Sequence, residues 1–178
     1  MIRINSDEFK AWHEVGHATV CLHLGGDLDG IEFLEGDARG FAVARGCAVM
    51  PDKERSVACG GFAVEFYLLR AGCIDGVDLN DSSEVARVSS LVFSNSWIDQ
   101  QAFSRRMVTD DNDFTKEENE EFMRYAIECV APIFDLYFAK MQIVVSELLA
   151  ARKIDGMRVK ELLQIGDMRS GDMGSASQ

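Results

Sequence analysis

The chain has 178 residues, a hydrophobic fraction of 47% and a formal net charge of −12. This length fits one domain with a substantial core, and the presence of only two prolines argues against a disordered, low-complexity chain. The acidic balance argues against nucleic acid and anionic membranes as default partners.

The first predicted element is a helix over residues 6–24, in which apolar side chains recur at helical spacing. Ser6 is suited to cap its start, and the glycine pair at 25–26 is suited to end it. Two short stretches of alternating polarity follow at 30–36 and 40–50, both flanked by glycines. Their pattern predicts a small antiparallel sheet.

Helices are predicted for most of the next hundred residues. The helix expected over 51–70 carries a glycine pair at 60–61, and each glycine costs about 1 kcal/mol relative to alanine. Such glycines indicate that another backbone packs closely at this point. Further helices are expected over 78–93 and 97–107.

The acid-rich segment 110–121 contains half of the net charge of the chain. We interpret it as a helix start rather than a docking surface, because Thr115 and Glu118 have the spacing of a capping box and acids favour a helix N-terminus. The long helix that follows is expected to be interrupted at Pro132. A last short helix is expected to end near Leu163.

The spacing of the cysteines and the N-terminal residues indicate the cellular compartment of the protein. The five cysteines are widely spaced and form no C-x-x-C pair: Cys21, Cys47, Cys59, Cys73 and Cys129. This pattern favours reduced, buried thiols. No signal-peptide pattern and no apolar run of about 18 residues is visible, so we expect a cytoplasmic protein without membrane insertion.

The three histidines all lie between positions 13 and 23, and two of them form an H-E-x-x-H motif at residues 13–17. On a helix, His13 and His17 are one turn apart and about 40° apart around the axis, so both can reach one zinc ion. Glu14 lies beside them and can act as general base on a zinc-activated water during peptide hydrolysis.

A catalytic zinc needs a third protein ligand. His23 has the spacing of the last metzincin histidine, but the glycine that breaks the helix in that motif is Val20 here. An unbroken helix places His23 about 120° around the axis from His17, so we interpret it as an ordinary residue at the helix end.

Several segments in the same order resemble the FtsH-type zinc peptidases, the protease portion of membrane-anchored AAA+ machines. The most specific is AWHEVGHA at 11–18, which resembles A-x-H-E-x-G-H-A, and GGFAVE at 60–65 resembles G-G-R-A-A-E. Residues 78–87 are similar to the D-L-x-x-A-T-x-I-A-R segment, and 148–163 are similar to the closing helix pair. The resemblance covers about residues 7–165.

The resemblance implies that Asp78 is the third zinc ligand, because the family uses the aspartate of its D-L segment. Asp81, one turn further along, is the fallback, and a plain helix cap is the alternative role for Asp78. Glu65 is another candidate ligand, as in zincins with a downstream helix glutamate, although the family precedent makes it a supporting carboxylate. The strand at 40–50 resembles the family's substrate-binding edge, where a peptide adds as a further strand.

The sequence departs from the FtsH-type pattern at several points, so some family properties are not expected of this chain. The arginine after the glycine pair is Phe62, and the asparagine before the ligand aspartate is Val77. The chain contains no G-x-x-x-x-G-K-[ST] loop, so we expect no ATP-driven unfolding by this chain alone. A separate AAA+ ATPase is a candidate partner, and the oligomeric state does not carry over.

The sequence therefore predicts a mainly helical α+β, zincin-like domain over 1–165 and a disordered tail over 166–178. It predicts one Zn²⁺ bound by His13, His17 and Asp78, with Glu14 as the catalytic base of a metallopeptidase acting on peptides or unfolded proteins. The alternative is a non-catalytic adaptor or regulatory domain that keeps the fold. Retention of Glu14 favours the enzyme, because a structural zinc site has no need of that carboxylate.

Overall fold

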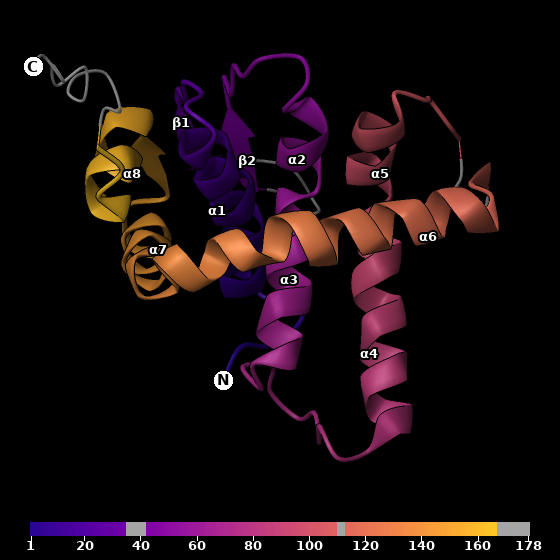
Figure 1. The fold of residues 1–178 in the computed structure, drawn as a ribbon. Coiled ribbons are helices and arrows are strands. Elements are labelled where there is room, and N and C mark those ends of the chain that lie inside the picture. Colours follow the sequence, from indigo (N-terminus) through magenta and orange to yellow (C-terminus); the bar gives the residue numbers. More distant parts are fainter. Residues whose placement is uncertain (35–41, 110–112, 167–178) are drawn as a thin grey trace, which may run out of the picture.

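The computed structural model describes residues 1–34, 42–109 and 113–166. These residues form a mainly helical α+β domain with one small antiparallel sheet, as the sequence predicts (Figure 1). The predicted tail lies outside the described residues except for Gly166.

Helix α1 (Asp7–His23) lies at the centre of the domain, and ten of its 17 residues are buried. The Ser6 side chain accepts a hydrogen bond from the Phe9 N–H, which confirms the predicted cap. α1 packs against α3 (Gly60–Arg70) on one side and α7 (Ala131–Ala151) on another. It is therefore held along most of its length.

The sheet has three strands in the order β2-β1-β3, so β2 and β3 are its edges. β1 (Gly30–Phe33) pairs antiparallel with β2 (Ala42–Arg45), which confirms the predicted antiparallel sheet over shorter ranges. β1 also pairs with β3 (Lys153–Asp155), a three-residue strand that the sequence analysis did not predict. The predicted strand residues within 35–41 lie outside the described part of the chain.

The helix predicted over 51–70 is divided at Cys59 into α2 (Glu54–Ala58) and α3. The glycine pair therefore begins α3 instead of lying in mid-helix. The expected close packing is present, because a Cβ on Gly16 of α1 would overlap the Gly60 carbonyl oxygen. A Cβ on Gly61 would overlap the His13 ring. The glycines thus allow α3 to approach the histidine-bearing stretch of α1.

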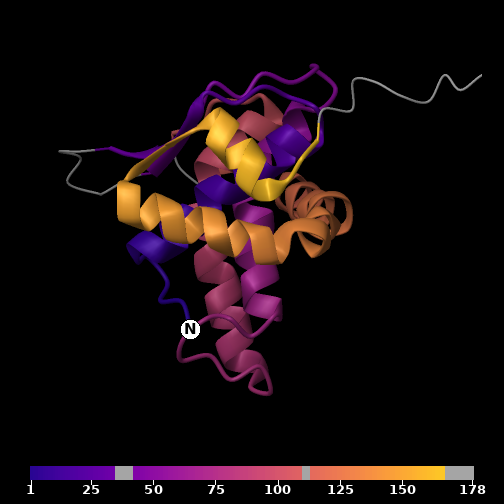
Figure 2. The same cartoon turned by 90° about the vertical axis from the view of Figure 1, so that its left-hand side faces the viewer.

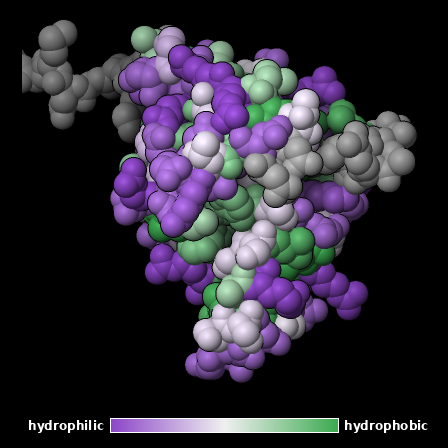
Figure 3. Space-filling model, turned by 90° about the vertical axis from the view of Figure 1, so that its right-hand side faces the viewer, coloured by the Kyte–Doolittle hydropathy of each residue, from purple (hydrophilic) through white to green (hydrophobic). Residues whose placement is uncertain are grey.

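Helix α4 (Ser82–Asn95) lies beside α3, and α5 (Trp97–Ser104) follows it directly (Figure 1). α4 begins four residues later than predicted, because Asp81 is its cap and accepts hydrogen bonds from the Ser83 and Glu84 N–H groups. The side of the molecule that carries α4, α5 and α6 (Lys116–Tyr125) is largely hydrophilic, with apolar side chains exposed between the polar ones (Figure 3).

Helix α6 starts with the predicted capping box of Thr115 and Glu118. It continues through a π-helical segment, η2 (Ala126–Val130), into α7, and the chain changes direction there, so that α7 runs beside α8 (Gly156–Leu163) and across the line of α6 (Figure 2). Pro132 lies in the first turn of α7, directly after the π-helical segment, so the regular α-helix is interrupted next to the predicted position.

By length and composition alone, the helical stretch Lys116–Ala151 is able to cross a membrane. Its inward face nevertheless belongs to the core of the domain. The fully buried side chains from this stretch are Phe122, Ala126, Val130, Phe134, Met141, Val144 and Leu148. The apolar character of the stretch is thus explained in part by packing within the protein.

The expectation of reduced thiols is wrong for two of the five cysteines. Cys21, near the end of α1, forms a disulfide with Cys47, which follows β2. The two residues are 26 positions apart, and spacing in the sequence gives no sign that the sheet folds back onto α1 at this point. Of the three free cysteines, Cys59 is buried and Cys129 is exposed.

Candidate metal centre

The two histidines of the H-E-x-x-H motif face each other from successive turns of α1. Their Nε2 atoms are 3.2 Å apart, and their rings meet edge to face with centroids separated by 4.8 Å. This is the arrangement that the four-residue spacing predicts on a helix. Both side chains are largely buried, at 18% exposure for His13 and 15% for His17.

The third side chain at this point is Asp99, which α5 contributes. Its Oδ1 lies 3.3 Å from the His17 Nε2, and its Oδ2 lies 3.5 Å from the His13 Nε2. A tetrahedral zinc with ligand bonds of 2.0–2.1 Å places its ligand atoms about 3.3 Å apart. The Nε2–Nε2 separation of 3.2 Å is close to that value, and each histidine lies near a different oxygen of the Asp99 carboxylate, so the three side chains converge on a space where a metal ion could bind.

The other ring nitrogen of each histidine is bound by a neighbouring helix. The Nδ1 of His13 lies 2.8 Å from the Glu65 carboxylate on α3, and the Nδ1 of His17 lies 2.7 Å from the Val57 carbonyl oxygen on α2. In a neutral imidazole, each Nδ1 carries the proton that it donates, and each Nε2 then presents a lone pair. Metal-binding histidines have this kind of outer support, because it fixes both the ring and its tautomer.

Charge in the cluster is balanced between buried acids and imidazoles. Burial lowers the pKa of His13, but the nearby Asp99 and Glu65 carboxylates outweigh it and hold that pKa well above 6.5. In His17, burial is likewise outweighed by Asp99, and the pKa is raised. Burial acts to raise the pKa of Asp99, but the two histidines reverse the effect and lower it. The site thus holds a carboxylate and favours a cationic partner.

Two buried carboxylate oxygens have no hydrogen-bond partner, and they belong to Asp99 (Oδ2) and Glu65 (Oε2). A buried, unpaired carboxylate oxygen is costly unless a cation or a proton satisfies it. Burial raises the pKa of the Glu65 carboxyl group, so a proton can satisfy its unpaired oxygen. The unpaired Asp99 Oδ2 lies 3.5 Å from the His13 Nε2, so a cation bound between these side chains would satisfy it.

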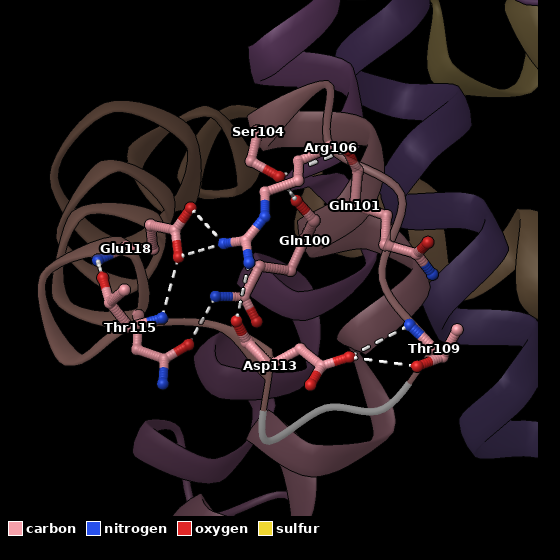
Figure 4. Close-up of polar contacts among 9 residues, drawn as sticks. Gln100, Gln101, Ser104, Arg106, Thr109, Asp113, Thr115 and Glu118 are labelled. Atoms are coloured by element: carbon pink, nitrogen blue, oxygen red, sulfur yellow. Dashed lines mark hydrogen bonds and ion pairs between the residues drawn. The ribbon is translucent and has the colours of Figure 1, made fainter.

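A polar network fixes α5, the element that carries Asp99, to the start of α6 (Figure 4). Arg106 donates to both carboxylate oxygens of Glu118 at 2.7 Å and to the Asp113 carbonyl oxygen at 2.9 Å. Gln100, next to Asp99 in the chain, donates to the Asn119 side chain at 2.5 Å. These contacts help to hold α5 in place. This helix is short and has little core surface of its own.

Glu14 points from α1 toward the edge strand of the sheet. Its Oε2 accepts a hydrogen bond of 2.7 Å from the Ala44 backbone N–H on β2. It is also close enough to His17 to act on that residue's pKa, which its charge raises. The carboxylate therefore lies beside the histidine pair and is not one of the three side chains that meet there, as expected for a base that does not bind the metal.

The structure does not bring Asp78 to the histidine pair. Asp78 lies in the exposed loop before α4, where its Oδ1 accepts hydrogen bonds from the backbone and side chain of Asn80. Asp81, the fallback, caps α4 and is equally engaged. Glu65 supports His13 through Nδ1, in agreement with the supporting role that the resemblance implies.

His23 lies at the last position of α1, as predicted, and its Nδ1 is 3.2 Å from the Tyr137 hydroxyl. Within the described residues, His13, His17 and Asp99 are the one group of three that can hold a metal ion. The candidate third ligand in the structure is therefore Asp99 and not Asp78.

One local signal points to Asp99 in retrospect. It lies four residues before Phe103 on the predicted helix 97–107, so both share a face, and Phe103 is only 4% exposed. An acid on the buried face of a helix needs a cationic or metal partner. That partner belongs to another element, and the sequence alone does not identify it.

No protein-family model matches this chain, and no curated protein sequence matches it.

Proposed function

We propose that this protein is a zinc-dependent metallopeptidase whose metal is held by His13, His17 and Asp99. The observation that carries the proposal is the convergence of two imidazole Nε2 atoms, 3.2 Å apart, with the Asp99 carboxylate, whose two oxygens lie 3.3 Å from the His17 Nε2 and 3.5 Å from the His13 Nε2. Three protein ligands leave the fourth corner open, which is typical of a catalytic zinc and not of a structural one.

Zinc, when bound, would polarise a peptide carbonyl group and lower the pKa of a water molecule at the open corner. Glu14 would take the proton from the attacking water and pass it to the leaving amine. Glu65 and the Val57 carbonyl oxygen would keep both imidazoles in the metal-binding tautomer. Each role belongs to a residue whose position in the structure suits it.

The substrate class that suits the site is an extended peptide or an unfolded protein segment. β2 is an edge strand, and its Ala44 N–H lies at hydrogen-bond distance from Glu14, so a strand added to this edge would pass close to the base. The resemblance to FtsH-type peptidases agrees with this substrate class, with cleavage independent of ATP by this chain alone.

Zinc analysis and a peptidase assay on the same preparations test the proposal. Wild-type protein prepared with sufficient metal should contain one zinc per chain and cleave an unstructured peptide library. Glu14→Gln should keep the zinc, because Glu14 is not a ligand, and lose at least about 100-fold in cleavage rate. His23→Gln is the matched control and should retain both properties. Protein without stoichiometric zinc would rule the proposal out.

A non-catalytic adaptor is the second candidate, and one observation favours it. The Glu14 carboxylate is already bound by the Ala44 N–H, so it is restrained in this structure. An adaptor should contain zinc and bind peptides, but Glu14→Gln should leave every measured property unchanged. Cleavage that is present in the wild type and absent in Glu14→Gln would favour the metallopeptidase over the adaptor.

A further inference from the structure

α1 and the edge strand β2 are joined at two points. The first is the hydrogen bond from the Ala44 N–H to Glu14, and the second is the disulfide between Cys21 and Cys47. Because seven residues make almost two turns, Glu14 and Cys21 lie on the same face of α1, about 10 Å apart along its axis. Cys47 lies two residues beyond the end of β2, so the second contact follows the first closely along the chain.

The hydrogen bond at the first point occupies two groups that catalysis would need. A peptide that adds to the edge of β2 needs free backbone N–H groups, and the Ala44 N–H is bound to Glu14. Glu14 in turn has one carboxylate oxygen committed to the strand. The base and the strand therefore satisfy each other, and an incoming peptide has to displace this contact.

The disulfide at the second point keeps the strand in this position. β2 pairs with β1 on one side only, and Gly46, directly before Cys47, has a positive φ of 66°, which lets the chain turn toward α1. Ala48 exchanges two hydrogen bonds with Asp27, so the chain beyond the disulfide is attached independently. Loss of the disulfide would therefore release this end of β2 from α1, while the hydrogen bond from the Asp29 N–H to the Arg45 carbonyl oxygen keeps the strand in the sheet.

We propose that the Cys21–Cys47 disulfide is a redox lock that holds β2 on Glu14, and that its reduction opens the edge strand to an incoming peptide. The effect on catalysis rests on the proposed peptidase function, whereas the effect on the strand does not. Redox-sensing disulfides are a known class in reducing compartments, where structural ones are rare.

The chemistry of opening is a thiol–disulfide exchange with a dithiol reductant. Cys21 is fully buried and Cys47 is partly exposed, so a reductant thiolate attacks the Cys47 Sγ and the Cys21 thiolate leaves and takes up a proton. The second thiol of the reductant resolves the mixed disulfide and releases Cys47 as a thiol. Two electrons pass to the protein, and the reductant becomes a disulfide.

Hydrogen exchange at the Ala44 amide, measured by NMR on the whole zinc-loaded chain, tests the lock directly. We expect exchange to become faster by roughly tenfold or more when a dithiol reduces the wild-type protein. Cys47→Ser should show the fast rate without reductant and no further response. Cys73→Ser, which removes a free cysteine, is the matched control and should behave as wild type.

Peptide cleavage by the same samples gives the functional result. Reduction and Cys47→Ser should each lower KM severalfold, because the edge strand no longer has to be freed by the substrate. An Ala44 exchange rate that is equal in oxidised and reduced protein overturns the lock, and so does detectable cleavage that has the same KM in both. If no sample cleaves any peptide, the peptidase proposal fails, and the exchange rates still decide on the lock. Reduced wild type has the unaltered sequence, so poor folding of the variant does not remove the test.

Discussion

The two helices that form the candidate metal centre are held in different ways. α1 has 17 residues with ten buried, and it supplies both histidines and the candidate base. α5 has eight residues with three buried, and it supplies Asp99. The histidine pair is thus fixed by core packing, whereas the helix that carries the acid packs mainly against α2 and is joined to the start of α6 by polar contacts. Perturbing α1 should damage the fold, and perturbing α5 should damage mainly the metal site.

The largest effect is expected from removal of the charge on Asp99. Asp99→Asn keeps the side-chain shape but replaces a zinc ligand by a poor one, so zinc affinity should fall by more than about 100-fold, since loss of an outer-shell partner alone costs 10- to 100-fold. Competition with a chromophoric chelator measures the change. Asp78→Asn is the control and should lower affinity by less than about threefold, because Asp78 lies in the exposed loop with Asn80. The reverse ranking would restore Asp78 as the ligand.

The contact between α1 and α3 gives the next largest effect. Gly16→Ala adds a methyl group that overlaps the Gly60 carbonyl oxygen and the Val64 side chain, so the two helices have to separate. The free energy of unfolding should fall by about 2 kcal/mol, a typical cost of overpacking. Urea denaturation of the metal-free protein measures it.

Gly166→Ala is the control for this glycine, since nothing lies within 4 Å of a Cβ at that position. The free energy of unfolding should change by less than about 0.5 kcal/mol. A Gly16→Ala protein as stable as the wild type would show that α1 and α3 are packed less tightly than the structure indicates.

The same contrast explains which features the sequence could predict. The cap at Ser6, the capping box of Thr115 and Glu118, and the positions of His13 and His17 depend on residues three or four apart, so local rules suffice. The partnership of Asp99 with the histidines joins residues more than 80 positions apart and depends on how α5 docks. Nothing local marks that docking.

Two further features were missed for the same reason. β3 has only three residues and exists because β1 has a free edge, which no pattern within Lys153–Asp155 reveals. The Cys21–Cys47 bond depends on β2 folding back against α1. Both are products of tertiary packing, and both lie outside what composition and periodicity can specify.

Dependence on pH should separate the metal-free site from the zinc-loaded one. The folded-state pKa of His13 is raised above 6.5 because Asp99 and Glu65 outweigh the effect of burial, so protonated His13 stabilises the metal-free fold below pH 6.5. This stability is lost as the pH rises through the folded-state pKa. Zinc needs neutral imidazole, so its affinity should rise over the same interval, by about tenfold per pH unit for each proton displaced.

Thermal melts between pH 5.5 and 8.5, with and without excess zinc, measure both trends. The metal-free Tm should fall as the pH increases, and the shift in Tm produced by zinc should grow. His23→Gln should leave the zinc-dependent trend unchanged, because His23 lies outside the cluster. A zinc-induced shift that is independent of pH would contradict binding by the two histidines.

The smallest effect is expected at the polar network that holds α5. Arg106→Ala removes the paired hydrogen bonds to Glu118 and the one to the Asp113 carbonyl oxygen, so α5 loses its main attachment to the start of α6. Because the pair is partly exposed, the free energy of unfolding should fall by only about 0.5–1 kcal/mol. Zinc affinity should nevertheless fall severalfold, since Asp99 is then less well positioned.

Lys116→Ala is the matched control, because it also removes one positive charge at the start of α6 but breaks only the exposed pair with Glu120. Its zinc affinity should equal that of the wild type. A loss of affinity in Arg106→Ala without a comparable loss of stability would show that the network serves the metal site more than the fold. Equal zinc affinity in the two variants would show instead that α5 is held by its apolar contacts, among which the buried Phe103 ring is the largest.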